Sequence, residues 1–370
     1  MIPLDPHFIA QTTPTGEAIA RAVEAGWPLG PVAHCVLLRR GFNQVYELHF
    51  ASGLHAIARL SAERPRGDPN IAYETALLTH LRAHGIPVAA PLPAADGSFS
   101  VVLALPEGPR ALLLFDFLPG DPPGESLVDI EATGRGLAQL HGAAQSYAGP
   151  ESHYTLDLPL LLDASLQRML TAPTVDAALA REFTALAEDL RSRFADPPSL
   201  TRVHCHGDCH GSNNFMADSP DNPEGAERSR VAAFFDFDDA GPGLLAYELS
   251  VYLWVLLPRS HETPATAAVM ERWHRYLIGY TGVRAIHAAD LAAITPCLAL
   301  RQFWVMGEYA GRIPVWGTQA MPTHWLRKQP ALMRAWMDLP PADQLAAQEP
   351  AKAATAPASS TAAATAAATA

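Results

Sequence analysis

The chain has 370 residues, a net charge of −12 and a composition that is 49% hydrophobic and 17% charged. This length exceeds the roughly 100–200 residues of one domain, so we expect two packed lobes. The acidic charge disfavours nucleic-acid binding, which needs a basic face, and no apolar run reaches the roughly 18 residues of a membrane span. We therefore expect neither nucleic acid nor a membrane as a partner.

The two ends of the sequence carry no catalytic pattern. The start, MIPLDPHFIA, lacks the basic and apolar segments of a secretory signal, and four cysteines are too few for a disulfide framework. We therefore expect reduced thiols in a cytoplasmic protein. Residues 346–370 are rich in Ala, Thr, Ser and Pro without large apolar side chains, so we expect a disordered tail.

Residues 1–118 are predicted to form an N-terminal lobe built on a small antiparallel sheet with one helix. A helix over 71–85 would bury Leu77, Leu78 and Leu81 on one face and end at Gly85. Runs rich in β-branched and aromatic residues, bounded by turn residues, indicate strands. We expect these strands over 32–39, 44–50, 54–60, 99–105 and 110–118.

Residues 119–345 are predicted to form a larger, mainly helical lobe. The turn at 119–123 breaks the strand pattern, and helices follow over 129–144 and 175–194. A β-like patch over 212–218 and 231–239 predicts an inserted hairpin, and 245–337 is again helical. The expected fold class is therefore α+β with two lobes.

The segment HCHGDCHGSNN, residues 204–214, carries the most chemistry. Its histidines and cysteines could form a zinc cluster, but they lack the paired spacing of zinc sites. The alternative is a catalytic loop of the form H-x-D-x-x-x-x-N, made by His206, Asp208 and Asn213. Such a loop places a carboxylate at a substrate hydroxyl and an amide oxygen at Mg²⁺. The pattern favours this second interpretation.

A second acidic element supports the catalytic loop. Residues 234–239 read as an apolar strand that ends in carboxylates. Asp236 could bind the Mg²⁺ that bridges nucleotide phosphates, whereas a lone acidic turn would only be solvated. Because it follows Asp208 and Asn213 at hairpin distance, we favour a metal site.

These two motifs, HGDCHGSNN and FFDFDDAGPG, resemble a phosphotransferase family. It includes aminoglycoside phosphotransferases, choline kinases, a pseudomonad type of homoserine kinase and a bacterial stress-response kinase, all with a bilobal protein-kinase-like fold. The resemblance covers about residues 30–340 and implies ATP and Mg²⁺ as cofactors. It makes Asp208 the catalytic base, Asn213 and Asp236 the Mg²⁺ ligands, and His206 a brace for the loop.

The resemblance also implies a nucleotide site in the N-terminal lobe. Gly41, Phe42 and Asn43 lie where the family has its phosphate-covering loop, although with one glycine instead of G-x-G-x-x-G. Arg59 would bind phosphate and pair with Glu74. Residues 112–120, with Asp116 and Leu118, would be the hinge whose backbone receives adenine.

The acceptor is predicted to be a small hydroxylated molecule: an amino alcohol, a homoserine-like or an aminoglycoside-like compound. The short stretch between Asp236 and Glu248 leaves little room for an activation segment that supports a protein substrate. A Ser/Thr protein kinase of the stress-response type is the alternative, and a nucleotide-binding pseudokinase is a second one. Four acids would suit an amine on the acceptor: Asp238, Asp239, Glu248 and Glu308.

Overall fold

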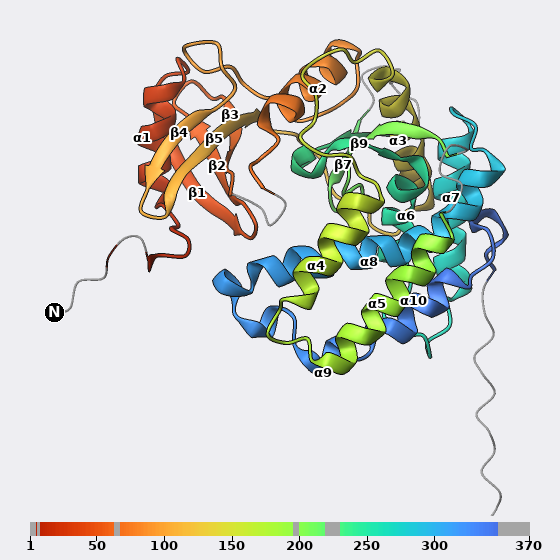
Figure 1. The fold of residues 1–370 in the computed structure, drawn as a ribbon. Helices are drawn as coiled ribbons and strands as arrows, with labels where there is room; N and C mark the ends of the chain where they lie inside the picture. The colour runs from red at the N-terminus through yellow and green to blue at the C-terminus, as the bar shows by residue number, and fades with distance from the viewer. Residues whose placement is uncertain (1–4, 6–7, 63–66, 195–199, 219–229, 347–370) are drawn as a thin grey trace, which may run out of the picture.

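The computed structural model describes residues 5, 8–62, 67–194, 200–218 and 230–346, and it has an α+β fold. Figure 1 shows a lobe built on a sheet and a larger helical lobe beside it. The predicted fold class is therefore confirmed. Except for Ala346, the predicted tail lies outside the described residues. No helix in the described part of the chain is long and apolar enough to cross a membrane.

A five-stranded antiparallel sheet forms the first lobe, with the strand order β1-β2-β3-β5-β4. Alternation in β2 buries Tyr46, Leu48 and Phe50 on one face and turns Val45, Glu47 and His49 to the other. The five predicted strands are all present. They are β1 (Val32–Arg40), β2 (Gln44–Phe50), β3 (His55–Leu60), β4 (Val101–Leu105) and β5 (Gly108–Asp116).

The described residues of this lobe form two helices, so the prediction of one was wrong. The missed helix, α1 (Gly16–Gly26), begins after Thr15, whose side chain accepts a hydrogen bond from the Ala18 amide. Ile19, Val23 and Trp27 follow at intervals of four and are buried, so the sequence did contain the signal. The predicted helix is α2 (Ile71–Ala83), which buries Leu77, Leu78 and Leu81.

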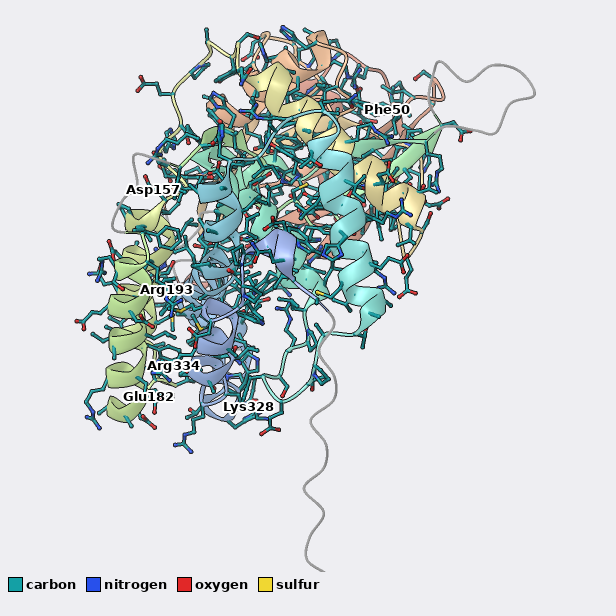
Figure 2. The ribbon with its side chains drawn as sticks, turned by 90° about the vertical axis from the view of Figure 1, so that its right-hand side faces the viewer. Phe50, Asp157, Glu182, Arg193, Lys328 and Arg334 are labelled. Atoms are coloured by element: carbon teal, nitrogen blue, oxygen red, sulfur yellow. The ribbon has the colours of Figure 1, made fainter. Side chains whose placement is uncertain are left out.

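The helical lobe is organised around α8 (Ala288–Trp316). This helix packs against α4 (Ser165–Leu170), α6 (Leu245–Leu256) and α10 (Gln329–Met337). Figure 2 shows α5 and α10 side by side, with the exposed charged side chains of Glu182, Arg193 and Arg334 around them. The other helices are α3 (Leu127–Ala144), α5 (Ala177–Ser192), α7 (Ala267–Thr281) and α9 (Thr323–Leu326).

Two short strand pairs bring the sequence motifs together. The predicted hairpin is β7 (Asn214–Asp218) with β8 (Arg230–Phe234), which is shorter than expected because the chain turns into a 3₁₀ segment, Phe237–Asp239. An unpredicted pair joins β6 (Arg202–Cys205) to β9 (Gly241–Leu244), whose GPGL sequence has poor strand propensity. The connections after β6 and after β8 carry the candidate residues.

Candidate active site

A cavity of about 350 Å³ is lined by residues of both lobes. The sheet side supplies apolar walls such as Val45, Ile57 and Phe115, and the helical side supplies Phe215 and Phe235. The polar part of this lining includes Arg59, Glu74, Asn213 and Asp236. Such a cleft suits a ligand with a flat apolar part and a charged part.

The loop after β6 is held from below by a buried carboxylate. The two oxygens of Glu248 accept hydrogen bonds from the backbone amides of His206 (2.9 Å) and Gly207 (3.0 Å). Gly207 has a φ of +85°, and a Cβ there would lie 2.2 Å from the carbonyl oxygen of Asp239. The turn therefore requires glycine.

His206 connects this loop to the second motif. Its Nδ1 accepts a hydrogen bond from the Asp208 amide (3.3 Å), and its Nε2 donates to the Phe235 carbonyl (2.9 Å). Burial lowers the pKa of His206, which favours the neutral ring that these two contacts need. The geometry agrees with a bracing role.

Asp208 lies at the centre of a polar network. Its carboxylate forms an ion pair with Arg301 of α8, and the Asn213 side-chain amide donates to it at 3.1 Å. His210 Nε2 lies 3.4 Å from Oδ2, the same oxygen that accepts from Asn213, whereas Arg301 pairs with Oδ1. Burial alone would raise the pKa of Asp208, but the positive charge of Arg301 outweighs it and holds that pKa well below its usual range.

Asp236 and Asn213 are joined through the backbone, since the Phe235 amide donates to the Asn213 carbonyl at 3.1 Å. Asp236 has a φ of 67°, and it is the only non-glycine residue with a positive φ in the described part of the chain. Such a backbone costs about 1–3 kcal/mol and is found mainly at functional sites. Burial and the nearby Asp238 raise the pKa of Asp236 to about 8. The site thus concentrates negative charge that a cation would neutralise.

On the sheet side, Arg59 and Glu74 form the expected ion pair. The two terminal guanidinium nitrogens of Arg59 lie 2.7 and 2.6 Å from the Glu74 oxygens, and both side chains are buried. Arg59 Nε is also buried and has no hydrogen-bond partner in the described part of the chain. A buried donor in this state would be satisfied by a ligand oxygen.

Three residues expected over the phosphates do not line the cavity: Gly41, Phe42 and Asn43. The Phe42 ring packs on Trp316 at 4.6 Å between ring centroids. The Asn43 amide donates to Asp238 at 2.6 Å, while its oxygen accepts from the Ala62 amide. This segment therefore links the two lobes. Of the hinge residues, Asp116 and Leu118 both line the cavity, and Asp116 forms an ion pair with Arg82.

The four acids expected at the acceptor do not share one surface. Asp238 binds Asn43, and Glu248 is fully buried beneath the loop. Asp239 and Glu308 are also buried, with Glu308 3.5 Å from Arg168. None of the four lines the cavity. Asp239, Glu248 and Glu308 are buried and Asp238 is half-buried, and a role for any of these acids in receiving an amine stays a prediction.

The zinc interpretation of residues 204–214 is not supported. Cys205 and Cys209 are buried. In the described parts of the chain, the only group of three or more potential ligands whose atoms all lie within 4.8 Å of one another is found elsewhere, at Glu47, His49 and His55.

Sequence reasoning missed the cationic and aromatic side chains near Asp208. Besides pairing with Asp208, Arg301 lies 4.5 Å from the Trp304 ring centroid and 5.4 Å from that of Trp254. Arg259 also stacks on the Trp254 ring, with its guanidinium 3.7 Å from the ring centroid. Because Arg301 is 93 residues from Asp208 in the chain, no local pattern could have identified it.

Comparisons with known proteins agree with this geometry. A sequence model of a phosphotransferase enzyme family matches residues 34–286, more than half of the chain. An uncharacterized protein of Deinococcus radiodurans is 35% identical over 77% of this chain and 79% of its own length. A homoserine kinase of Cupriavidus metallidurans is 30% identical over 64% of this chain and 68% of its own length. The structure of a microcompartment-associated aminopropanol kinase is similar in fold, with a TM-score of 0.66, 22% identity, and coverage of 87% of this chain and 97% of that one.

Proposed function

The chain belongs to the phosphotransferase enzyme family, and on that premise we propose that it moves the γ-phosphoryl group of Mg²⁺-bound ATP to a hydroxyl of a small molecule. One observation carries the proposal. Asn213 hydrogen-bonds to Asp208 through its side chain and to the Phe235 amide, next to Asp236, through its carbonyl, and Asn213 and Asp236 line the same cleft as the Arg59–Glu74 pair. Positioning and charge neutralisation supply most of the rate in phosphoryl transfer.

The nucleotide would occupy the cleft. The apolar walls contributed by Val45, Ile57 and Phe115 suit a planar base near the hinge at Asp116 and Leu118. Arg59 would bind phosphate oxygens through its free Nε, while Glu74 holds the guanidinium in place. Gly41, Phe42 and Asn43 would act by closing one lobe on the other, since they contact the helical lobe.

Asn213 and Asp236 fit a hard divalent cation. Both line the cleft, and the Asn213 side-chain nitrogen is occupied by Asp208, which leaves its oxygen as a ligand. Burial and the neighbouring Asp238 raise the pKa of Asp236, so a cation beside its carboxylate would be favourable. Bound Mg²⁺ would supply that charge and neutralise phosphate oxygens.

Asp208 would orient the acceptor hydroxyl and accept its proton. Its low pKa keeps it ionised at neutral pH, so it acts mainly by positioning rather than as a strong base. His206 and Arg301 would hold its backbone and its carboxylate, respectively.

A small acceptor is favoured over a protein. Between Asp236 and α6 the chain forms only a short 3₁₀ segment and β9, so no extended segment is present there to support a peptide. Among small acceptors we favour one with a carboxylate, like homoserine. Arg259 is exposed and forms no ion pair in the described part of the chain, and it stacks on the same Trp254 ring that Arg301 approaches. Homoserine kinases are among the relatives.

The test measures phosphate transfer by mass with Mg²⁺-ATP and a matched acceptor pair, homoserine and 3-aminopropan-1-ol, which differ only in the carboxylate. Choline, aminoglycosides and a basic protein complete the panel. We expect transfer to homoserine, lowered about 10²–10⁴-fold in Asp208→Ala. Asp236→Asn should remove the Mg²⁺ dependence of nucleotide binding.

The variant Arg259→Met examines the acceptor separately. It should raise KM for homoserine about tenfold with little change in kcat, as expected when a binding contact is lost. Transfer to 3-aminopropan-1-ol at an equal rate would reject the carboxylate proposal but keep the kinase. Transfer to protein alone would favour the protein-kinase alternative, and ATP binding without any transfer would favour a pseudokinase.

A further inference from the structure

We propose that Glu47, His49 and His55 form a binding site for a divalent transition metal such as Zn²⁺ on the N-terminal sheet, separate from the transfer chemistry. The three residues come from β2 and β3, where His49 and His55 are directly paired across the strands. Glu47 precedes His49 by two residues and so lies on the same face of the sheet.

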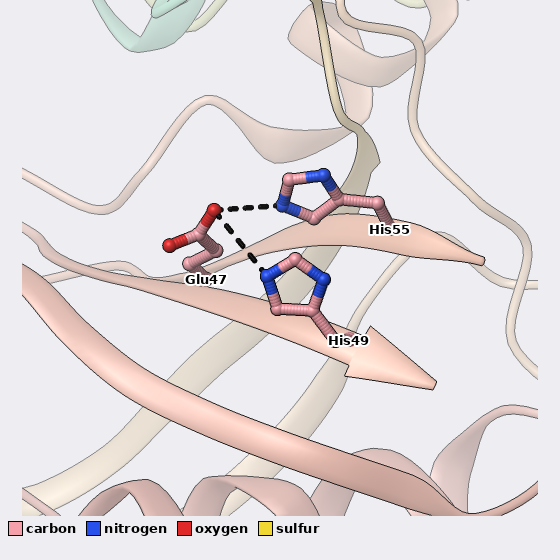
Figure 3. Close-up of side chains that lie close together, drawn as sticks. All are labelled: Glu47, His49 and His55. Atoms are coloured by element: carbon pink, nitrogen blue, oxygen red, sulfur yellow. Dashed lines mark hydrogen bonds and ion pairs between the residues drawn. The ribbon is translucent and has the colours of Figure 1, made fainter. Parts of the chain in front are cut away.

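The three ligand atoms already converge. Glu47 Oε1 lies 2.8 Å from His55 Nε2 and 3.6 Å from His49 Nε2. Figure 3 shows both imidazoles directing a ring nitrogen toward that one carboxylate oxygen. A tetrahedral ion with bonds of about 2.0–2.1 Å separates its ligand atoms by roughly 3.3 Å. The two observed distances bracket this value, so small side-chain rotations would complete the site.

The ligand types select the class of metal. Imidazole nitrogens with a carboxylate suit Zn²⁺, Cu²⁺ or Ni²⁺, whereas Mg²⁺ prefers oxygen ligands and retains its waters. A fourth side chain is close, because His34 pairs with His49 across β1 and β2, with ring centroids 6.3 Å apart. The proposed site thus differs in chemistry from the Asn213–Asp236 pair.

The position of the site gives it a structural connection to the cleft. The His55 ring stacks on Phe117, with centroids 3.5 Å apart, and Phe117 lines the cavity. Ile57, the cross-strand partner of Glu47, lines it as well. A bound ion would therefore fix a hairpin that forms part of the cleft wall.

The experiment titrates chelator-treated full-length protein with Zn²⁺ by calorimetry in the absence of nucleotide, and repeats the titration with Co²⁺ to follow its visible absorption. We expect one saturable site that gives an intense, tetrahedral-type Co²⁺ band. His49→Ala and His55→Ala should each weaken Zn²⁺ binding by at least about tenfold and remove the band. His84→Ala is the matched control, since His84 is exposed and stacks on another histidine, His80, in α2.

The melting temperature of each metal-free variant establishes that it is folded. His49→Gln serves as a second variant at this exposed position and should behave like His49→Ala. The proposal is overturned if wild type shows no saturable site. It is equally overturned if both histidine variants keep the wild-type affinity and spectrum, or if His84→Ala loses as much affinity as they do.

Discussion

Replacing Arg301 by Met tests how the carboxylate of Asp208 is held. The Arg301 guanidinium is buried, pairs with Asp208, and also donates to the Gly207 carbonyl and the Tyr247 hydroxyl, both at 3.2 Å. Removing one partner of a buried ion pair costs about 3–5 kcal/mol, because the other charge is left without compensation. A comparable loss in positioning Asp208 would lower kcat about 10²-fold or more.

The pH profile distinguishes this effect from a general loss of stability. In the wild type the pKa of Asp208 is depressed, so its stabilising contribution is present above the unfolded pKa and is lost only as the pH falls to the depressed value. Without Arg301, burial dominates and the pKa rises. We therefore expect the acid limb that Asp208 contributes to the rate profile to move to higher pH.

The assay records kcat/KM against pH for wild type, Arg301→Met and Arg301→Lys, with thermal melts of each. Lysine keeps the charge but not the planar fork, so it should restore the pH profile more fully than the rate. Arg230→Met is the control, because it breaks a 2.6 Å ion pair between Arg230 of β8 and Asp129 of α3. If the profile of Arg301→Met overlays that of wild type, Arg301 does not act on Asp208.

Three further predictions concern the loop and the cleft. Gly207→Ala should reduce both the melting temperature and activity, because a Cβ would lie 2.2 Å from the Asp239 carbonyl oxygen. Gly211→Ala is the control: its Cβ would meet only ordinary contacts at 3.6 and 3.8 Å, so thermal melts should show little change. Burial raises the pKa of Glu248 to about 7. Below about pH 7 the protonated carboxyl loses an acceptor for the loop amides, so activity should fall. Glu248→Gln should be slow and should lack this acid limb of the rate profile. The same shift means that ionised Glu248 destabilises the fold, so wild-type stability should decline as the pH rises from about 4.5 through 7, and denaturant titrations of Glu248→Gln should not show that decline. Arg59→Met should raise the Kd for ATP by about tenfold or more in calorimetry, and an unchanged Kd would remove Arg59 from the phosphate site.

Local chemistry could be predicted from the sequence where the interacting groups are close in the chain. Asp208 and Asn213 are five residues apart and form a hydrogen bond, whereas the pairing of Arg59 with Glu74, fifteen residues on, was expected only from the family resemblance. The strands were predicted because their side chains alternate between two environments. The helix α1 was missed although its buried residues recur at intervals of four.

Long-range contacts explain most of what the sequence did not predict. Nothing in the neighbourhood of Arg301 indicates that it pairs with a loop 93 residues away. In the sequence, Glu248 and Glu308 look like any other helical glutamates. The fold buries both side chains, and it places Glu248 beneath the loop, where it accepts a hydrogen bond from the His206 amide. A buried carboxylate and a ligand-binding one have the same letter in the sequence, and only packing distinguishes them.

The preformed contacts bear on whether the chain acts as a kinase or only binds nucleotide. The Arg59–Glu74 ion pair is formed, and the two motifs are held together by the hydrogen bonds of His206 and Phe235. A protein that only bound nucleotide would have no use for a half-buried Asp236 in a left-handed conformation, which costs about 1–3 kcal/mol and gathers charge beside Asp238. It would also have no use for an arginine that keeps Asp208 ionised. These costs are balanced only if a cation and a phosphoryl group occupy the site together, so we expect nucleotide and Mg²⁺ to bind cooperatively. Calorimetric titration of ATP with and without Mg²⁺ measures this coupling, and equal affinities would contradict it.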